Sequence, residues 1–113
     1  MTIDSEQLPR QLERGLAPLY TVFGDEPLLA IEAADRIRAA ARARGHTERD
    51  VLTVESGFDW KSLWLTGASL SLFAEKRIVE LRIPTGAPGV EGSEAIVKYT
   101  SDLPPDTVTL VDL

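Results

Sequence analysis

The sequence predicts an α/β domain of three layers, in which helices cover both faces of a mainly parallel sheet. Two observations predict this architecture. Four short runs rich in Val, Ile, Leu and Thr alternate with helical segments along the 113 residues. These runs are largely apolar along their length, which is typical of parallel strands that are buried on both faces.

The first helix and the first strand are predicted within the opening 23 residues. Asp4 or Ser5 can cap a helix that runs to about Arg14. Pro9 fits only the first turn of a helix, so the regular helix is expected to begin there. Residues 19–23, LYTVF, form a short run of β-formers that ends at a glycine. We therefore expect a buried strand at this position.

The clearest helical pattern lies between residues 25 and 45. Asp25 or Glu26 is a suitable N-cap, Pro27 falls in the first turn, and Gly45 is a suitable C-cap. One apolar stripe is expected to pack on the sheet, and it consists of Leu29, Ala33, Ile37 and Ala40.

The remaining residues continue the alternation. Further strands are predicted at 50–54, 76–83 and 107–111, helices at 60–70 (capped by Asp59) and 93–100, and a loop at 85–92. Right-handed crossovers between these strands lead to a Rossmann-like sheet. Because the sequence stops at VTLVDL, at the tip of a strand, we expect residues 1–113 to be one domain and a fragment of a longer protein.

Composition excludes several classes of function. The absence of cysteine excludes disulfides and thiolate metal sites. No apolar run is long enough to span a membrane, and the polar N-terminus does not resemble a signal peptide. A chain with a net charge of -6 is expected to bind nucleic acid poorly on its own. We therefore expect a cytoplasmic protein with no membrane contact and no bound metal.

The first strand, Gly24 and the following helix occupy the place of a phosphate-binding loop, but the residues do not fit one. Such a loop needs glycines, a lysine for the phosphates and a hydroxyl for Mg²⁺, and those positions hold Leu29, Ala30 and Ile31. Asp25 and Glu26 would repel phosphate, and Pro27 lacks a backbone N–H. We interpret Gly24, Asp25, Glu26 and Pro27 as a degenerate, non-functional loop that binds no cofactor.

Other candidate residues have simpler interpretations. Asp112 follows an apolar strand, as a Mg²⁺-holding aspartate would, but a polar strand end is favoured. His46 follows a helix-ending glycine and is expected in solvent. Trp60 and Trp64 are expected in the core rather than as a base-stacking platform. A solvated face is favoured over a nucleic-acid site for four dispersed arginines, Arg36, Arg38, Arg42 and Arg44. Without a nucleophile–base pair or metal cluster, no catalytic activity is expected.

A Leu-Phe pair, Leu72 and Phe73, lies in a short connection within SLSLFAEKR, residues 69–77. The residues alone leave two interpretations open. The pair packs back into the core, or it projects as a hydrophobic anchor for a pocket on a partner. Burial of each side chain by a partner would contribute about 1.5–3 kcal/mol, and spacing alone does not decide between the two interpretations.

Several segments together resemble the N-terminal domain of the bacterial DNA polymerase III delta subunit, a clamp-loader component. They are residues 5–29 (SEQLPRQLERGLAPLYTVFGDEPLL), 58–60 (FDW) and 71–73 (SLF), the last followed by a basic residue and an apolar strand. They span most of the chain in the family's order and spacing. The GDEPLL segment is the most specific of them.

The resemblance implies an AAA+-like fold that neither binds nor hydrolyses ATP and has no catalytic activity of its own. It also implies binding to the sliding clamp, the DNA polymerase III beta subunit, and opening of one clamp interface. Leu72 and Phe73 would insert into a hydrophobic pocket on the clamp, with Leu70 assisting. Clamp-binding motifs often carry Gln where this chain has Ala68, so we expect a weaker contact with the polar part of that pocket.

In the family, a lid domain and a collar domain follow, and the collar assembles with the other loader subunits. We expect neither domain in this chain, so DNA would be contacted only indirectly, through an assembled loader. Two alternatives remain beside this interpretation. One is a degenerate P-loop nucleotide-binding enzyme domain. The other is an α/β interaction domain unrelated to clamps, in which Leu72 and Phe73 would be buried.

Overall fold

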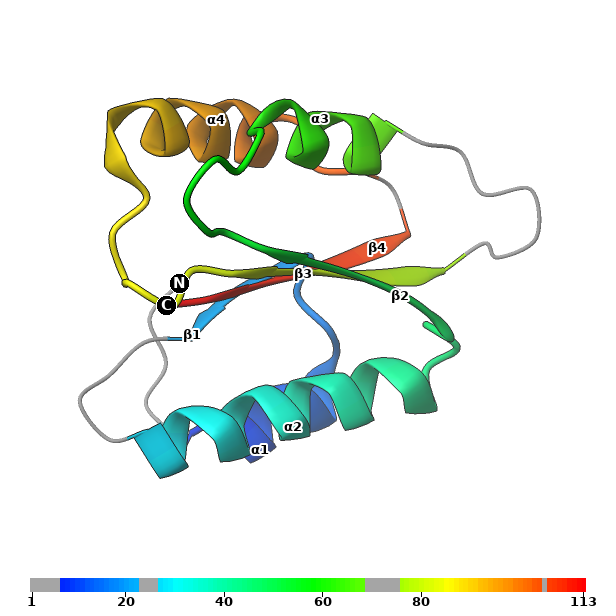
Figure 1. Cartoon of the computed structure of the whole chain (residues 1–113). Helices are drawn as coiled ribbons and strands as arrows, with labels where there is room; N and C mark the ends of the chain where they lie inside the picture. The colour runs from blue at the N-terminus through cyan, green and yellow to red at the C-terminus, as the bar shows by residue number, and fades with distance from the viewer. Residues whose placement is uncertain (1–6, 23–26, 69–75, 105) are drawn as a thin grey trace.

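The computed structural model alternates helices with strands (Figure 1) and describes residues 7–22, 27–68, 76–104 and 106–113. Within these ranges the elements in chain order are α1 (Leu8–Arg14), β1 (Leu19–Val22), α2 (Pro27–Ala43), β2 (Glu48–Thr53), α3 (Lys61–Ala68), β3 (Arg77–Arg82), α4 (Gly89–Ser101) and β4 (Thr107–Asp112). The predicted alternation is confirmed. The N-cap candidates Asp4 and Ser5 lie outside the described residues.

The described strands form one parallel sheet in the order β1-β4-β3-β2. The first and last strands are therefore neighbours, with Leu19 opposite Thr109 and Val22 opposite Asp112. Helices α1 and α2 cover one face of the sheet, and α3 and α4 cover the other (Figure 1). The predicted three-layer α/β class with a parallel sheet is confirmed.

Each face of the sheet has its own apolar core, because successive residues of a strand point to opposite faces. On the α1/α2 face, Ile78 and Leu110 pack with Ile37 of α2. On the α3/α4 face, Leu81 of β3 packs with a second group that includes Trp60, Leu63, Tyr99 and Val111. The two cores share only the sheet between them, so each can be considered separately.

Helix α2 packs on the sheet through a stripe that is rotated from the predicted one. The most buried residues are Ala34, Ile37 and Ala41, at 1%, 2% and 0% exposure. Leu29, which was predicted to lie on the stripe, is 47% exposed. At about 100° per residue, Leu29 lies about 80° around the helix from Ile37. The prediction for Leu29 is therefore wrong, because small alanines let the other flank of the helix approach the sheet.

Two of the predicted helix boundaries are confirmed by their hydrogen bonds. The Oδ1 atom of Asp59 accepts a bond from the N–H of Lys61 at 3.0 Å, as expected of a cap for α3. Gly45 has a φ of +97°, and its N–H donates to the carbonyl oxygen of Arg42 at the end of α2.

Helix α4 differs from the prediction, because it begins at Gly89 within the segment that was expected to be a loop. Gly92 indicated a loop but lies inside the helix. A Cβ built on Gly92 would lie 2.8 Å from Cε2 of Trp60 and 2.9 Å from Cβ of Pro88. This glycine is therefore explained by close packing against the indole ring rather than by a turn.

Candidate functional site

Most of the residues predicted to form sites lie outside the described part of the chain. This is the case for Gly24, Asp25 and Glu26 of the degenerate loop, and for the anchor residues Leu70, Leu72 and Phe73. Pro27 is described and is the first residue of α2. The exposure of the anchors, which separates the two interpretations of the Leu-Phe pair, therefore stays a prediction.

The elements that flank these two segments lie at opposite ends of the sheet. The degenerate loop connects the carboxyl end of β1, at Val22, to α2. The anchor segment connects the end of α3 to the amino end of β3, at Arg77. Val22 is paired with the last residue of β4 and Arg77 with its first residue, Thr107. The described residues next to the two segments, Val22 and Arg77, therefore lie at opposite ends of the sheet.

Helix α3 leads to the anchor segment and has one buried side and one exposed apolar side. Leu63 is 1% exposed in the second core, whereas Trp64 and Leu65 are 46% and 65% exposed. We call Trp64 and Leu65 the α3 face. The prediction of a core position is confirmed for Trp60 and wrong for Trp64. Trp60 precedes the first residue of α3, so the helical spacing that placed both on one face does not apply.

The ring of Trp64 is held by a contact between α3 and α4. The Nζ atom of Lys98 lies 4.9 Å from the centroid of the Trp64 ring, which is a cation–π contact. The neighbouring Val97 is also exposed, at 64%. The tryptophan is therefore oriented by its neighbour while nearly half of its surface remains available to a partner.

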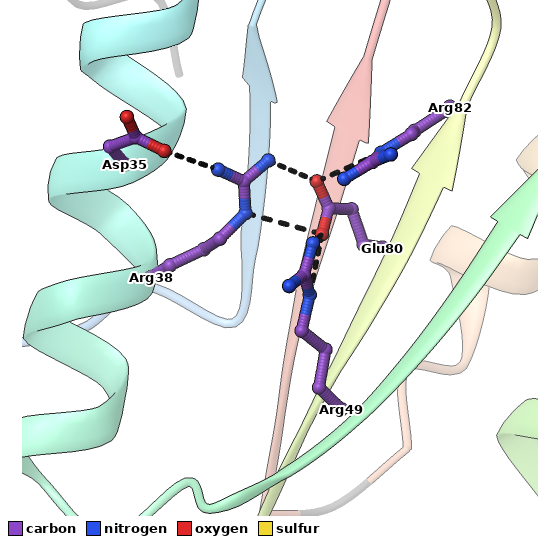
Figure 2. A network of polar contacts seen from close by, with 5 residues as sticks. All are labelled: Asp35, Arg38, Arg49, Glu80 and Arg82. Atoms are coloured by element: carbon purple, nitrogen blue, oxygen red, sulfur yellow. Dashed lines mark hydrogen bonds and ion pairs between the residues drawn. The ribbon is translucent and has the colours of Figure 1, made fainter.

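The buried charge in the sheet is a separate feature, centred on Glu80 (Figure 2). Glu80 is 0% exposed and lies on the face covered by α2. Its Oε2 accepts hydrogen bonds from Nε and Nη2 of Arg49 at 2.9 and 2.6 Å and from Nε of Arg38 at 3.2 Å. Its Oε1 accepts from Nη2 of Arg38 and from Nε of Arg82, the latter at 3.4 Å. Arg38 also pairs with the exposed Asp35 at 2.7 Å.

These contacts keep Glu80 ionised. Burial by itself raises the pKa of Glu80, but hydrogen bonds from Arg38 and Arg49 lower it, and the net pKa lies below the ordinary value. A carboxylate with a lowered pKa and with donors on both oxygens is a weak general base. Its role is to connect α2, β2 and β3. The signal in the sequence was a glutamate inside the apolar run RIVELRI, since a charge in a buried strand needs partners.

Asp112, the other acid considered for chemistry, lies at the carboxyl end of β4, in register with Val22 and Arg82. Burial raises the pKa of Asp112, and the negative charge of Glu80 raises it further. Among the residues that the structure describes, no group of three His, Cys, Asp or Glu side chains could hold a metal ion. The interpretation of Asp112 as a polar strand end stays a prediction.

Two further predictions are corrected by the structure. His46 was expected in solvent, but it is 8% exposed, and its Nδ1 lies 3.1 Å from the carbonyl oxygen of Arg77. The turn at Gly45 directs the chain back to the amino end of β3, which buries the imidazole. Arg38 was expected on a solvated face, but its side chain is 13% exposed because it turns inward to Glu80. Throughout the described ranges, no helix combines the length and apolar character needed to cross a membrane.

The fold and these sites together define a three-layer parallel α/β domain whose described residues form no metal cluster. The family model for "DNA polymerase III, delta subunit" matches residues 20–112. The DNA polymerase III subunit delta of Escherichia coli is 31% identical over 106 residues, covering 94% of this chain and 31% of that protein. The Haemophilus influenzae subunit is 38% identical over 79 residues, covering 70% and 23%.

The chain therefore belongs to the DNA polymerase III delta subunit family. A solved structure of the DNA clamp loader delta protein of Bacillus subtilis has the same fold, with a TM-score of 0.74 at 19% identity. That match covers 96% of this chain and 35% of the other. The chain thus spans about a third or less of the length of each of these three relatives. The predicted family is confirmed, and the predicted parallel α/β fold matches that of the clamp loader delta protein.

Proposed function

We propose that this chain is the clamp-binding domain of a clamp-loader delta subunit. It binds the sliding clamp, the DNA polymerase III beta subunit, and helps to open one interface of the ring during replication in the cytoplasm. The observation that carries the proposal is the family match across residues 20–112, which includes the SLF segment. The anchors are Leu72 and Phe73, and Leu70 is an assisting contact.

The chemistry of the anchor segment supports this role. Two large apolar side chains in a short connection between α3 and β3 give affinity when a partner buries them. The net charge of -6 does not favour direct DNA binding, so contact with DNA is assigned to an assembled loader. Loader assembly is assigned to the collar domain of the family. We expect clamp binding, but not clamp loading, from residues 1–113.

The first test is a calorimetric titration of the chain against the sliding clamp of the same organism. The Leu72→Ala, Phe73→Ala double variant is expected to lose affinity by at least about a hundredfold, since each side chain contributes about 1.5–3 kcal/mol on full burial. The matched control is Leu28→Ala, Ile31→Ala, which removes two α2 side chains that are 66% and 58% exposed. The control should bind as the wild type does.

Equal clamp affinity of the wild type and the anchor variant would contradict the anchor assignment. A circular-dichroism melt of each protein establishes that it is folded. If the folded wild-type chain does not bind the clamp, the proposed function of this chain is wrong.

We also infer that the chain has no ATP-dependent activity. Helix α2 begins at Pro27, so Ala30 and Ile31, where a working loop needs a lysine and a hydroxyl, lie in its first turns. We expect ATP with Mg²⁺ to leave the melting temperature unchanged, because only a bound ligand stabilises a protein by mass action. A rise in melting temperature that depends on ATP concentration would instead support the nucleotide-binding alternative.

A further inference from the structure

The α3 face is an exposed apolar surface that the anchor residues do not account for. Trp64 and Leu65 are 46% and 65% exposed and are adjacent in the sequence. A large apolar side chain that remains in solvent contributes no burial energy to folding. Its burial by a partner contributes to the binding affinity instead. Tryptophan in particular is enriched among the residues that dominate binding energy at protein interfaces.

The α3 face is also held in one orientation. Leu63, the residue before Trp64, is 1% exposed in the second core and fixes the rotation of α3 about its axis. The Nζ atom of Lys98 in α4 lies over the Trp64 ring, 4.9 Å from its centroid, and this cation–π contact favours one orientation of the indole. An oriented aromatic side chain loses little conformational freedom on binding, so more of its burial appears as affinity.

Covalent geometry places the α3 face close to the proposed anchors. From Leu65 to Ala68 the helix rises about 4.5 Å, and the four residues from Ala68 to Leu72 span at most about 14 Å when extended. Leu65 and Leu72 are therefore no more than about 19 Å apart. A standard interface covers about 800 Å² of each partner, which is a patch about 32 Å across. One such patch can include the anchors and the α3 face together.

The identity of residue 68 gives a reason for a second apolar contact. Ala68 stands where clamp-binding motifs often carry Gln, so the polar part of the pocket receives no side-chain hydrogen bond from this position. Apolar contacts by Trp64 and Leu65, within the preceding turn of the same helix, would offset that loss.

We propose that the α3 face, formed by Trp64 and Leu65, is a second contact with the sliding clamp, beside Leu72 and Phe73. This inference rests on the proposed function. It adds an oriented aromatic contact on α3 to an anchor pair that lies beyond the end of the helix. The clamp is chosen over other occupants because the chain passes from this face to the anchors within one interface diameter. The exposed residues Leu28 and Ile31 of α2 adjoin the opposite end of the sheet.

The test compares Leu65→Ala with Leu28→Ala in calorimetric titrations against the clamp. The two leucines are matched, since they are 65% and 66% exposed and both lie on helices. Leu65→Ala should weaken clamp binding about fivefold to tenfold, and Leu28→Ala should leave it unchanged. Neither change removes a buried contact, so both variants should melt as the wild type does.

A second measurement follows Trp64 directly. The chain is labelled with 5-fluorotryptophan, which gives one ¹⁹F signal for Trp60 and one for Trp64, and Trp60→Phe assigns them. Addition of unlabelled clamp should shift or broaden the Trp64 signal and reduce its solvent-induced isotope shift, while buried Trp60 changes little. This readout reports contact at α3 even where the change in affinity is small.

The outcomes separate this inference from the proposed function. One outcome is that the anchor variant loses clamp binding, the Leu65→Ala variant binds the clamp as the wild type does, and the Trp64 signal does not change when clamp is added. In that case the α3 contact is wrong and the clamp-binding function stands. If the folded wild type does not bind the clamp, both fall. If Leu65→Ala instead abolishes a concentration-dependent dimer in sedimentation without changing clamp affinity, the α3 face belongs to a second copy of the chain, and the proposal is overturned.

Discussion

The two faces of the sheet are stabilised in different ways, although the same strands form both. Glu80 and Leu81 are adjacent in β3 and point to opposite faces. Glu80 receives three arginines on the side of α2, whereas Leu81 packs among apolar and aromatic side chains on the side of α3 and α4. One face thus combines an apolar core with a buried charge network, and the other relies on close packing around Trp60 and Tyr99.

The difference shows how each layer is positioned on the sheet. Apolar packing is non-directional, but the hydrogen bonds at Glu80 require that Arg38 of α2 and Arg49 of β2 face the carboxylate together. On the other face, α4 packs against Trp60, the residue before α3. This contact is possible because Gly92 of α4 has no side chain. Substitutions at Glu80 and at Gly92 therefore test the two faces separately.

The largest effect is expected from Glu80→Ala. Removing one partner of a buried ion pair leaves uncompensated charge, here that of Arg38, whose side chain is only 13% exposed. The free energy of unfolding should fall by about 3–5 kcal/mol, measured by urea denaturation. Asp35→Ala removes only the exposed partner of Arg38 and should cost about 1 kcal/mol or less. A loss of only about 1 kcal/mol for Glu80→Ala, as expected of an exposed pair, would show that the network is not a stabilising feature of this face.

Acidification sharpens the same comparison. The pKa of Glu80 lies below its ordinary value of 4.5, so its stabilising effect is complete above the unfolded pKa and is lost as pH falls through the folded pKa. The raised pKa of Asp112 acts with the opposite sign, because the folded state takes up that proton more readily than the unfolded state. The stability difference between wild type and Glu80→Ala should therefore shrink as the pH falls below the ordinary pKa of 4.5. A constant difference down to pH 2 would contradict the ionic origin.

A smaller effect is expected from Gly92→Ala on the other face. The new methyl group would press on the indole of Trp60 and on Pro88, and overpacking of this kind costs about 1–3 kcal/mol. Alanine otherwise favours a helix interior over glycine by about 1 kcal/mol. In a Trp60→Leu background the same change should therefore be neutral or stabilising by thermal melting. Equal destabilisation in both backgrounds would show that the indole is not the obstacle.

Much of the fold could be predicted because its signals are local. Apolar runs, Asp59 as a cap and Gly45 as a helix end each depend on neighbouring residues, and the structure confirms them. The glycines of the 85–92 segment led to the wrong prediction of a loop. Gly92 is required by close packing against Trp60, which is distant in the sequence. The burial of His46 likewise depends on the position of β3 relative to the end of α2. The periodicity of the sequence carries no information about that position.

Less of the candidate site could be predicted in this way. The anchors Leu72 and Phe73 came from a family resemblance, since a Leu-Phe pair in a connection is compatible with burial or with exposure. The exposure of Trp64 was missed, because i,i+4 spacing indicates one face only when both residues lie in the helix, and Trp60 does not. Glu80 was overlooked because its arginine partners come from three separate elements.

The pairing of the first strand with the last has a consequence for synthesis on the ribosome. Leu19 is placed opposite Thr109, so β1 has no strand partner until nearly the whole domain has been translated. At about 5–20 residues per second, the LYTV segment waits on the order of ten seconds after it emerges. During that time its amides and apolar side chains are open to chaperones or to other nascent chains. Among the described strands, β1 is thus the one that waits longest for its partner, and slower translation lengthens this interval.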